Sequence, residues 1–116
     1  MNVERWSVWL ANLDPVVGSE QGKTRPVLII SRSKINQILP VVNIVPLTSR
    51  KSGRLIYPNE ALVPFEAAGL DRESIALCFQ IRTLDKKRLI KPLGTLNDLD
   101  VRSEVLQALA FQLETI

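Results

Sequence analysis

Short apolar runs, separated by polar segments with glycine or proline, make up most of the chain. Runs of this length that contain β-branched and aromatic residues are typical of β-strands. The pattern predicts strands at residues 6–13, 25–31, 41–48, within 55–63, at 74–83 and at 90–96. Trp6 and Trp9 have opposite parity in the first run, so we expect one of them in the core and the other on the surface.

The run at residues 74–83 has the clearest alternation in the chain. In a strand, successive residues point to opposite faces of the sheet. We therefore expect one set of alternate residues to face the core, namely Ile75, Leu77, Phe79 and Ile81. The second set shares the other face, so Gln80 and Arg82 are expected to point together away from the core, as are Ala76 and Cys78.

The last part of the chain has a helical pattern. Apolar residues recur at helical spacing over residues 98–114 and predict a face that packs on the sheet, made of Val101, Val105, Ala108, Leu109 and Leu113. Asn97 is the expected N-cap. A single helical turn is expected at residues 33–39, before Pro40. Together the elements predict a mainly β fold, a small bent sheet or barrel with short helical insertions and a C-terminal α-helix.

With 116 residues the chain can bury one core, so residues 1–116 are expected to form a single domain. No apolar run reaches the length of a membrane span, and the first residues lack the features of a signal peptide. We therefore expect a cytoplasmic protein that does not associate with membranes. The single cysteine, Cys78, agrees with a reducing compartment.

The chain contains no histidine. Histidine is a common zinc ligand and the usual general base near neutral pH, so a metal site would need carboxylates alone. Catalysis would have to use Arg, Lys, Glu, Asp, Thr, Ser or Tyr, and neither a metal nor a cofactor is expected. The net charge of +3 weakly favours a polyanionic partner such as nucleic acid.

A polar loop with two glycines leads directly into an apolar strand, in the segment G-S-E-Q-G-K-T-R-P-V-L-I-I at residues 18–30. Gly18 and Gly22 allow backbone conformations that other residues avoid, and Pro26 fixes the entrance of the strand. A polar loop held by a rigid strand is a common way to position a binding or catalytic residue. An ordinary hairpin connection is the alternative for this segment. Two further polar clusters lie at residues 48–50 and 80–82.

These clusters, in the segment at 18–30, V-P-L-T-S-R at 45–50 and Q-I-R-T-L-D-K-K-R-L at 80–89, together with the C-terminal helix, resemble the MazF/PemK family of toxin endoribonucleases. The resemblance covers nearly the whole chain. It implies a small SH3-like β-barrel that forms a homodimer and cleaves single-stranded RNA, such as mRNA, at short sequences without metal. Attack by the ribose 2′-hydroxyl would give cyclic phosphate and 5′-hydroxyl ends. The implied partner of this type II toxin is a small antitoxin with an acidic, disordered tail.

By position in the family's motifs, the resemblance implies that Arg25, Thr48 and Glu20 are catalytic. Arg25 would stabilise the pentavalent phosphoryl group, Thr48 would donate a hydrogen bond to the scissile phosphate, and Glu20 would act as base. The implied RNA contacts are Ser19, Gln21, Lys23, Arg50, Gln80 and Arg82. Structural alternatives are that Arg25 pairs with Glu20 and that Thr48 is an ordinary strand-end residue. Arg82 could form an ion pair with Asp85.

Two positions depart from the family pattern. Trp6 and Ser7 stand where many members have Gly-Asp, and Phe79 stands where relatives often have an acidic or other polar residue. A phenylalanine cannot carry a proton, so no mechanism that uses this position for proton transfer is open to the chain. The departures favour an alternative function, a non-catalytic toxin or interaction module of the same fold that binds a DNA topoisomerase or nucleic acid.

Overall fold

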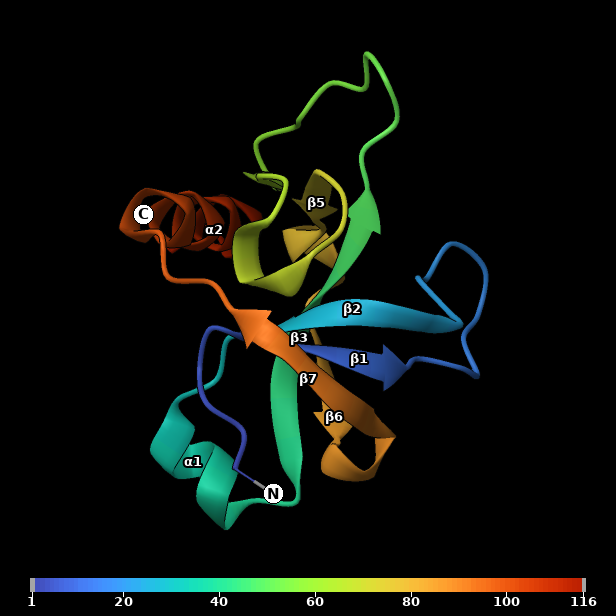
Figure 1. Ribbon diagram of the computed structural model, residues 1–116, viewed down its shortest axis with the longest axis vertical. Helices are drawn as coiled ribbons and strands as arrows, with labels where there is room; N and C mark the ends of the chain where they lie inside the picture. The colour runs from blue at the N-terminus through green and yellow to red at the C-terminus, as the bar shows by residue number, and fades with distance from the viewer. Residues whose placement is uncertain (1, 116) are drawn as a thin grey trace.

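The structure is a computed structural model that describes residues 2–115. Its elements in chain order are β1 (Ser7–Asn12), β2 (Thr24–Ile29), α1 (Ser33–Ile38), β3 (Val41–Ser49), β4 (Ala61–Val63), the 3₁₀ helix η1 (Ala67–Gly69), β5 (Ser74–Ala76), the 3₁₀ helix η2 (Cys78–Gln80), β6 (Arg82–Asp85), the 3₁₀ helix η3 (Lys86–Arg88), β7 (Leu89–Thr95) and α2 (Leu99–Leu113). In Figure 1 the two α-helices lie to the left of the strands, and the connection between β1 and β2 extends to the right. Over residues 2–115, no helix has the length and apolar character needed to cross a membrane.

The strands form one antiparallel sheet in the order β4-β5-β3-β2-β1-β7, and β6 pairs with β3 off this path. The long strand β3 organises the sheet, because its first part pairs with β6 and β2 and its last three residues pair with β5. Within the described chain β4 and β7 are the ends of the strand order, so the sheet does not close into a barrel. The predicted fold class, mainly β and SH3-like with short helical insertions and a C-terminal α-helix, is confirmed.

Both faces of the central strands are buried. Val8, Leu28 and Val45 belong to one core cluster, which also contains the buried face of α2. Their alternating neighbours, such as Val27 and Ile44, belong to a second cluster on the other face, together with residues of β6 and β7. Burial on both faces removes the usual alternation between core and solvent.

The prediction for the two tryptophans is therefore half wrong. Trp6 and Trp9 do lie on opposite faces, but both are buried, Trp6 in the cluster beneath α2 and Trp9 in the second cluster. The guanidinium groups of Arg5 and Arg102 lie over the Trp6 ring, at 5.0 Å and 5.3 Å from its centroid. Contacts of this kind are favourable cation–π interactions and shield the ring from solvent.

The C-terminal helix is confirmed with two corrections. Its N-cap is Asp98 and not Asn97, because the Asp98 carboxylate accepts hydrogen bonds from the backbone amides of Asp100 and Val101. The predicted face packs against the sheet through Val101, Val105, Ala108 and Leu109, whereas Leu113, in the last turn, is exposed.

The predicted strand at residues 74–83 is wrong as a single strand. It divides into β5 and β6, which are joined by η2. Between the pairs Leu47–Ala76 and Ile44–Arg82, the chain advances by three positions along β3 but by six on the partner side. The three extra residues form the 3₁₀ turn, which places Cys78 in the core and leaves Phe79 partly exposed. The strand predicted within residues 55–63 is confirmed as Ala61–Val63.

Candidate functional site

The β1–β2 loop (residues 13–23) is closed at its base by Asp14. The backbone N–H of Lys23 donates to Asp14 Oδ1 at 2.8 Å, and the N–H of Leu13 donates to the Lys23 carbonyl at 2.8 Å. A Cβ atom at position 22 would lie 2.6 Å from Asp14 Oδ1. Gly22 is therefore required by the close approach of the carboxylate, and it fixes the start of β2.

Arg25 lies in β2, opposite Ala11 of β1, and is half-buried. Its Nε donates a hydrogen bond of 2.9 Å to the carbonyl of Gly22. Among residues 2–115 its guanidinium forms no ion pair, so the alternative of a pair with Glu20 is wrong. The loop thus orients the side chain through Nε and leaves the two terminal nitrogens for another acceptor. Such a fork fits two oxygens of a phosphate.

Thr48 lies near the end of β3, on the face of the sheet that carries Arg25. Val27 of β2 pairs with Pro46 of β3, and paired residues share a face. Arg25 and Thr48 each lie two residues from this pair, toward the same end of the two strands, so both project from that face. The fold therefore places the two residues implied as phosphate ligands on one face of neighbouring strands, beyond the last cross-strand pair of β2 and β3.

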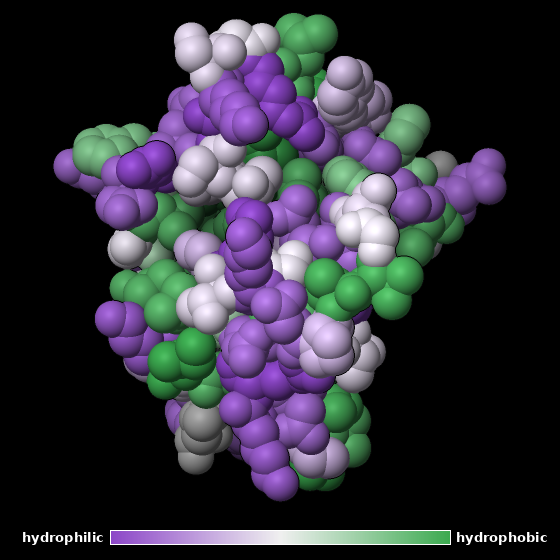
Figure 2. All heavy atoms as spheres, turned by 90° about the vertical axis from the view of Figure 1, so that its right-hand side faces the viewer, coloured by the Kyte–Doolittle hydropathy of each residue, from purple (hydrophilic) through white to green (hydrophobic). Residues whose placement is uncertain are grey.

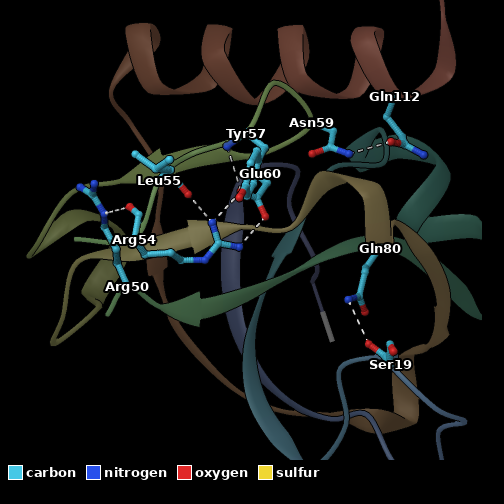
Figure 3. Close-up of polar contacts among 9 residues, drawn as sticks. All are labelled: Ser19, Arg50, Arg54, Leu55, Tyr57, Asn59, Glu60, Gln80 and Gln112. Atoms are coloured by element: carbon cyan, nitrogen blue, oxygen red, sulfur yellow. Dashed lines mark hydrogen bonds and ion pairs between the residues drawn. The ribbon is translucent and has the colours of Figure 1, made fainter. Parts of the chain in front are cut away.

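Gln80 and Arg82 reach from η2 and β6 to the β1–β2 loop. The Gln80 amide bridges two backbone groups, because its Oε1 accepts from Gln21 N at 2.7 Å and its Nε2 donates to the Ser19 carbonyl at 3.3 Å (Figure 3). Arg82 Nη1 donates to the Leu13 carbonyl at 3.3 Å, so its structural partner is this carbonyl and not Asp85. These bonds hold the loop against the sheet.

A pocket of about 500 Å³ opens between the loop and η2; we call it the site hollow. Its lining combines loop residues with the turn, namely Ser19, Glu20, Phe79, Gln80, Ile81 and Arg82. Glu20 is exposed, and its Oε1 accepts a hydrogen bond of 2.6 Å from the backbone N–H of Val17. The candidate base is thus part of the loop and is held by the loop backbone.

The other predicted RNA contacts fall into two groups. Ser19 and Lys23 are exposed on the loop, and the buried Oε1 atom of Gln21 has no hydrogen-bond donor among residues 2–115. Arg50 is engaged more firmly, since its Nη1 lies 3.1 Å from Glu73 Oε1 and its Nε donates to the Arg54 carbonyl. A buried acceptor without a donor is uncommon in proteins.

The β3–β4 loop (residues 50–60) contains an ion pair that the sequence reading missed. Both carboxylate oxygens of Glu60 accept hydrogen bonds of 2.8 Å from Arg54, and Glu60 Oε1 also accepts from Tyr57 N at 3.0 Å (Figure 3). The hydrogen bond from Arg54 lowers the pKa of the Glu60 carboxyl, against the effect of burial. Opposite charges on either side of Tyr57-Pro58 were the available sequence signal.

The surface around the β1–β2 loop is predominantly polar. The face on that side of the molecule has a band of hydrophilic residues along its long axis, with hydrophobic patches on either side (Figure 2). Over residues 2–115, no three His, Cys, Asp or Glu side chains lie close enough together to hold a metal ion.

Comparison with known proteins gives a consistent result. A family model described as the PemK-like, MazF-like toxin of type II toxin–antitoxin systems matches residues 4–113. The chain is 38% identical to Endoribonuclease EndoA of Bacillus subtilis (strain 168) over 109 residues, which is 92% of this chain and 93% of EndoA.

Solved structures agree with this relationship. MazF from Deinococcus radiodurans (Form-I) superposes with a TM-score of 0.82 and 29% sequence identity, over 98% of both chains. A structure of MazE-MazF from the same organism (Form-II) matches with a TM-score of 0.75 and 27% identity, over 100% of this chain and 99% of that chain. With the family model matching nearly its full length, this chain belongs to the family of PemK-like, MazF-like toxins of type II toxin–antitoxin systems.

Proposed function

We propose that this toxin is a metal-independent, sequence-selective endoribonuclease that cleaves single-stranded RNA in the cytoplasm. Residues 1–116 would form its single catalytic domain, which acts as a homodimer. The observation that carries the proposal is the placement of Arg25 and Thr48 on one face of neighbouring strands, with the terminal nitrogens of Arg25 free to bind phosphate. The family membership and the EndoA relative support the same activity.

In the proposed reaction the ribose 2′-oxygen attacks the adjacent phosphorus and the 5′-oxygen leaves. The products are a 2′,3′-cyclic phosphate and a free 5′-hydroxyl, so one proton leaves the 2′-hydroxyl and one is added to the 5′-oxygen. Negative charge builds on the phosphoryl oxygens in the transition state. Arg25 stabilises this charge through two hydrogen bonds from its guanidinium, and the Thr48 hydroxyl donates a third.

Glu20 is the proposed base that accepts the 2′-proton. Its carboxylate lines the site hollow beside Ser19, but it accepts a hydrogen bond from Val17 N and does not contact Arg25. The second carboxylate oxygen, Oε2, would accept the proton while Oε1 keeps its hydrogen bond to the loop backbone.

The remaining polar residues of the site are proposed to bind RNA, namely Ser19, Gln21, Lys23, Arg50, Gln80 and Arg82. Cationic side chains give salt-dependent affinity for the backbone, whereas amide groups read base edges. Gln21 is a candidate base reader because its side-chain Oε1 has no donor among residues 2–115, but the side chain would have to turn outward to meet a base.

The proposed regulatory partner is a small antitoxin with an acidic, disordered tail. Such a tail would cover the cationic residues at the site and fold as it binds. The Deinococcus radiodurans structure titled MazE-MazF, which matches this chain, supports a partner of this kind.

Incubation of the purified protein with a long, weakly structured RNA in EDTA tests the proposal. Discrete cuts with 5′-hydroxyl ends, lost in Arg25→Ala, are expected. Intact RNA at high concentrations of folded protein would contradict it and favour the alternative, a non-catalytic module that binds nucleic acid or a DNA topoisomerase. The partial exposure of Phe79 is the feature that favours this alternative, and inhibition of a topoisomerase without RNA cleavage would establish it.

A further inference from the structure

Phe79 lies between two hollows on the surface. It is 40% exposed and lines the site hollow beside Gln80. It also lines a second pocket of about 440 Å³ between the β3–β4 loop and α2, which we call the aromatic hollow. The aromatic hollow includes Arg54, Tyr57, Pro58, Glu60 and Phe111 in addition to Phe79. Phe79 is thus the one residue common to the linings of the two hollows within the described chain.

The position of Phe79 is fixed by the residues on either side of it. Cys78 is fully buried, and its Sγ lies 3.8 Å from the Val105 carbonyl of α2. Gln80 is bound to the β1–β2 loop backbone through both ends of its amide. The ring therefore projects from a short turn that is held at both ends, so little conformational entropy remains to be lost when a ligand stacks on it.

The aromatic hollow has the chemistry of a site for a flat, uncharged ring. Tyr57 and Phe111 are 57% and 60% exposed, and the Arg54 guanidinium lies 5.6 Å from the centroid of the Tyr57 ring. The one buried carboxylate at its floor, Glu60, is neutralised by Arg54 (Figure 3). Exposed aromatic side chains beside guanidinium groups are the usual means by which proteins bind successive unpaired bases.

We propose that Phe79 is a stacking platform for an unpaired base of the RNA, and that the aromatic hollow receives the nucleotide next to the one held in the site hollow. The inference rests on the proposed function, since it extends the RNA path beyond the scissile phosphate. It gives Phe79 a role in RNA binding at a position that cannot take part in proton transfer. Stacking tolerates any base, so this contact adds affinity and fixes register more than it reads sequence.

We assign this surface to single-stranded RNA because Phe79 borders both the site hollow, where the proposed function places RNA, and the aromatic hollow. The site hollow carries the amide and cationic groups that bind nucleotides, and the aromatic hollow begins at the other side of the same ring. A strand that leaves the scissile phosphate in this direction meets Phe79 first and then Tyr57. A protein partner that used only the aromatic hollow is an outcome that the experiment below distinguishes.

The test begins with wild-type cleavage, which maps the motif. An oligonucleotide with this motif and a 2′-deoxyribose at the cut site is then used to measure binding, because it lacks the attacking hydroxyl. Phe79→Leu removes the aromatic ring but keeps apolar bulk, and Phe79→Tyr and Phe79→Trp keep a ring. Phe65→Leu is the matched control, since Phe65 is an exposed phenylalanine that lines neither hollow.

Phe79→Leu is expected to weaken binding about five- to a hundredfold, the range for loss of one stacked base. The Tyr and Trp variants and Phe65→Leu are expected to bind like wild type. A scan with single abasic sites should find one position that weakens binding to wild type but not to Phe79→Leu. At saturating RNA, Phe79→Leu should keep the wild-type kcat, with the loss confined to KM.

Equal affinities of wild type and Phe79→Leu, or the same abasic penalties in both, would overturn the inference while leaving the nuclease intact. Unchanged RNA affinity with weaker binding of the cognate antitoxin would overturn it in favour of a protein contact. Absence of cleavage by wild type, which is measured before any variant, would overturn the proposed function and this inference with it.

Discussion

Arg25 and Thr48 lie on neighbouring strands, each two residues beyond the cross-strand pair of Val27 and Pro46 and toward the same end of the sheet. The arrangement is set by the strands and not by a flexible loop, because β1 pairs with β2 as far as Thr24 and β5 pairs with the end of β3. Residues on paired strands keep their relative positions when loops move. If Arg25 and Thr48 bind phosphate as proposed, their positions on the strands would be set before RNA binds.

Arg25→Ala is expected to lower kcat by about a hundred- to a thousandfold, the usual cost of losing a preorganised donor to a transition-state oxyanion. Arg25→Lys should fall between wild type and Arg25→Ala, since a lysine keeps the charge but cannot donate two parallel hydrogen bonds. Single-turnover cleavage in EDTA gives the rates. Arg32→Ala, at an exposed arginine before α1, is the control and should cleave like wild type.

Thr48→Val removes the hydroxyl and keeps the shape of the side chain. If this hydroxyl donates to the scissile phosphate, kcat should fall by about a hundredfold, with little change in the midpoint of thermal unfolding because Thr48 is not fully buried. Thr95→Val, at an exposed position in β7, is the matched control. Wild-type rates for Thr48→Val would mean that Thr48 is an ordinary strand-end residue.

The sequence was sufficient to predict where this pair lies, because Arg25 is at the start of one regular strand and Thr48 is near the end of another. The apolar runs at residues 25–31 and 41–48 correspond to β2 and β3 within two residues at each end. The resemblance to the family then implied roles for the polar residue that opens the first run and the one that closes the second. Strand parity and local motif are both properties of short segments, which a single sequence records.

Phe79 and Trp9 were misplaced because their positions depend on contacts distant in sequence. Phe79 continues the alternation of the run at 74–83. However, the registers in which β5 and β6 pair with β3 differ by three residues. These three residues form η2, which places Phe79 at the surface. Trp9 was one of two candidates for a surface position, yet the second core cluster covers that face of β1 as well. Neither the register of β5 and β6 on β3 nor the second core cluster can be recognised from the local sequence.

Gln80→Glu tests whether η2 holds the β1–β2 loop. The change replaces the amide donor that binds the Ser19 carbonyl with an acceptor, while an oxygen remains for Gln21 N. The loop should loosen, so amide hydrogens of residues 18–22 should exchange faster and KM for RNA should rise by about tenfold. Gln107→Glu, at an exposed position of α2, controls for the added charge. Unchanged exchange would show that other contacts are sufficient to hold the loop.

Cys78 is expected to be inert in the native protein. Burial raises the pKa of its thiol to about 12, so at pH 8 only about one molecule in ten thousand carries the reactive thiolate. Reaction with a thiol reagent such as DTNB requires the protein to open, so it should be slower than that of a small-molecule thiol by orders of magnitude at every reagent concentration. Reaction at the speed of a small-molecule thiol would contradict the buried position.

The Glu60–Arg54 pair should stabilise the fold more than the second ion pair in the same region does. The Glu60 side chain is 2% exposed and accepts three hydrogen bonds, whereas Glu73, the partner of Arg50, is 45% exposed. Glu60→Gln is expected to lower the free energy of unfolding by about 1.5–3 kcal/mol, the range for hydrogen bonds to charged groups. Glu73→Gln should cost less than about 1 kcal/mol. Urea denaturation measures both.

The pH dependence of unfolding for wild type and Glu60→Gln tests whether the charge of Glu60 causes the stabilisation. The pKa of Glu60 is lowered in the folded state by the hydrogen bond from Arg54. The stabilisation is therefore complete above the unfolded-state pKa of about 4.3, and it is lost as the pH falls through the lower folded-state pKa. The difference in unfolding free energy between wild type and Glu60→Gln should be constant from pH 7 to about pH 5 and shrink below about pH 4. A difference that stays the same down to pH 3 would mean that Glu60 stabilises the loop through its shape and neutral hydrogen bonds, and not through its charge.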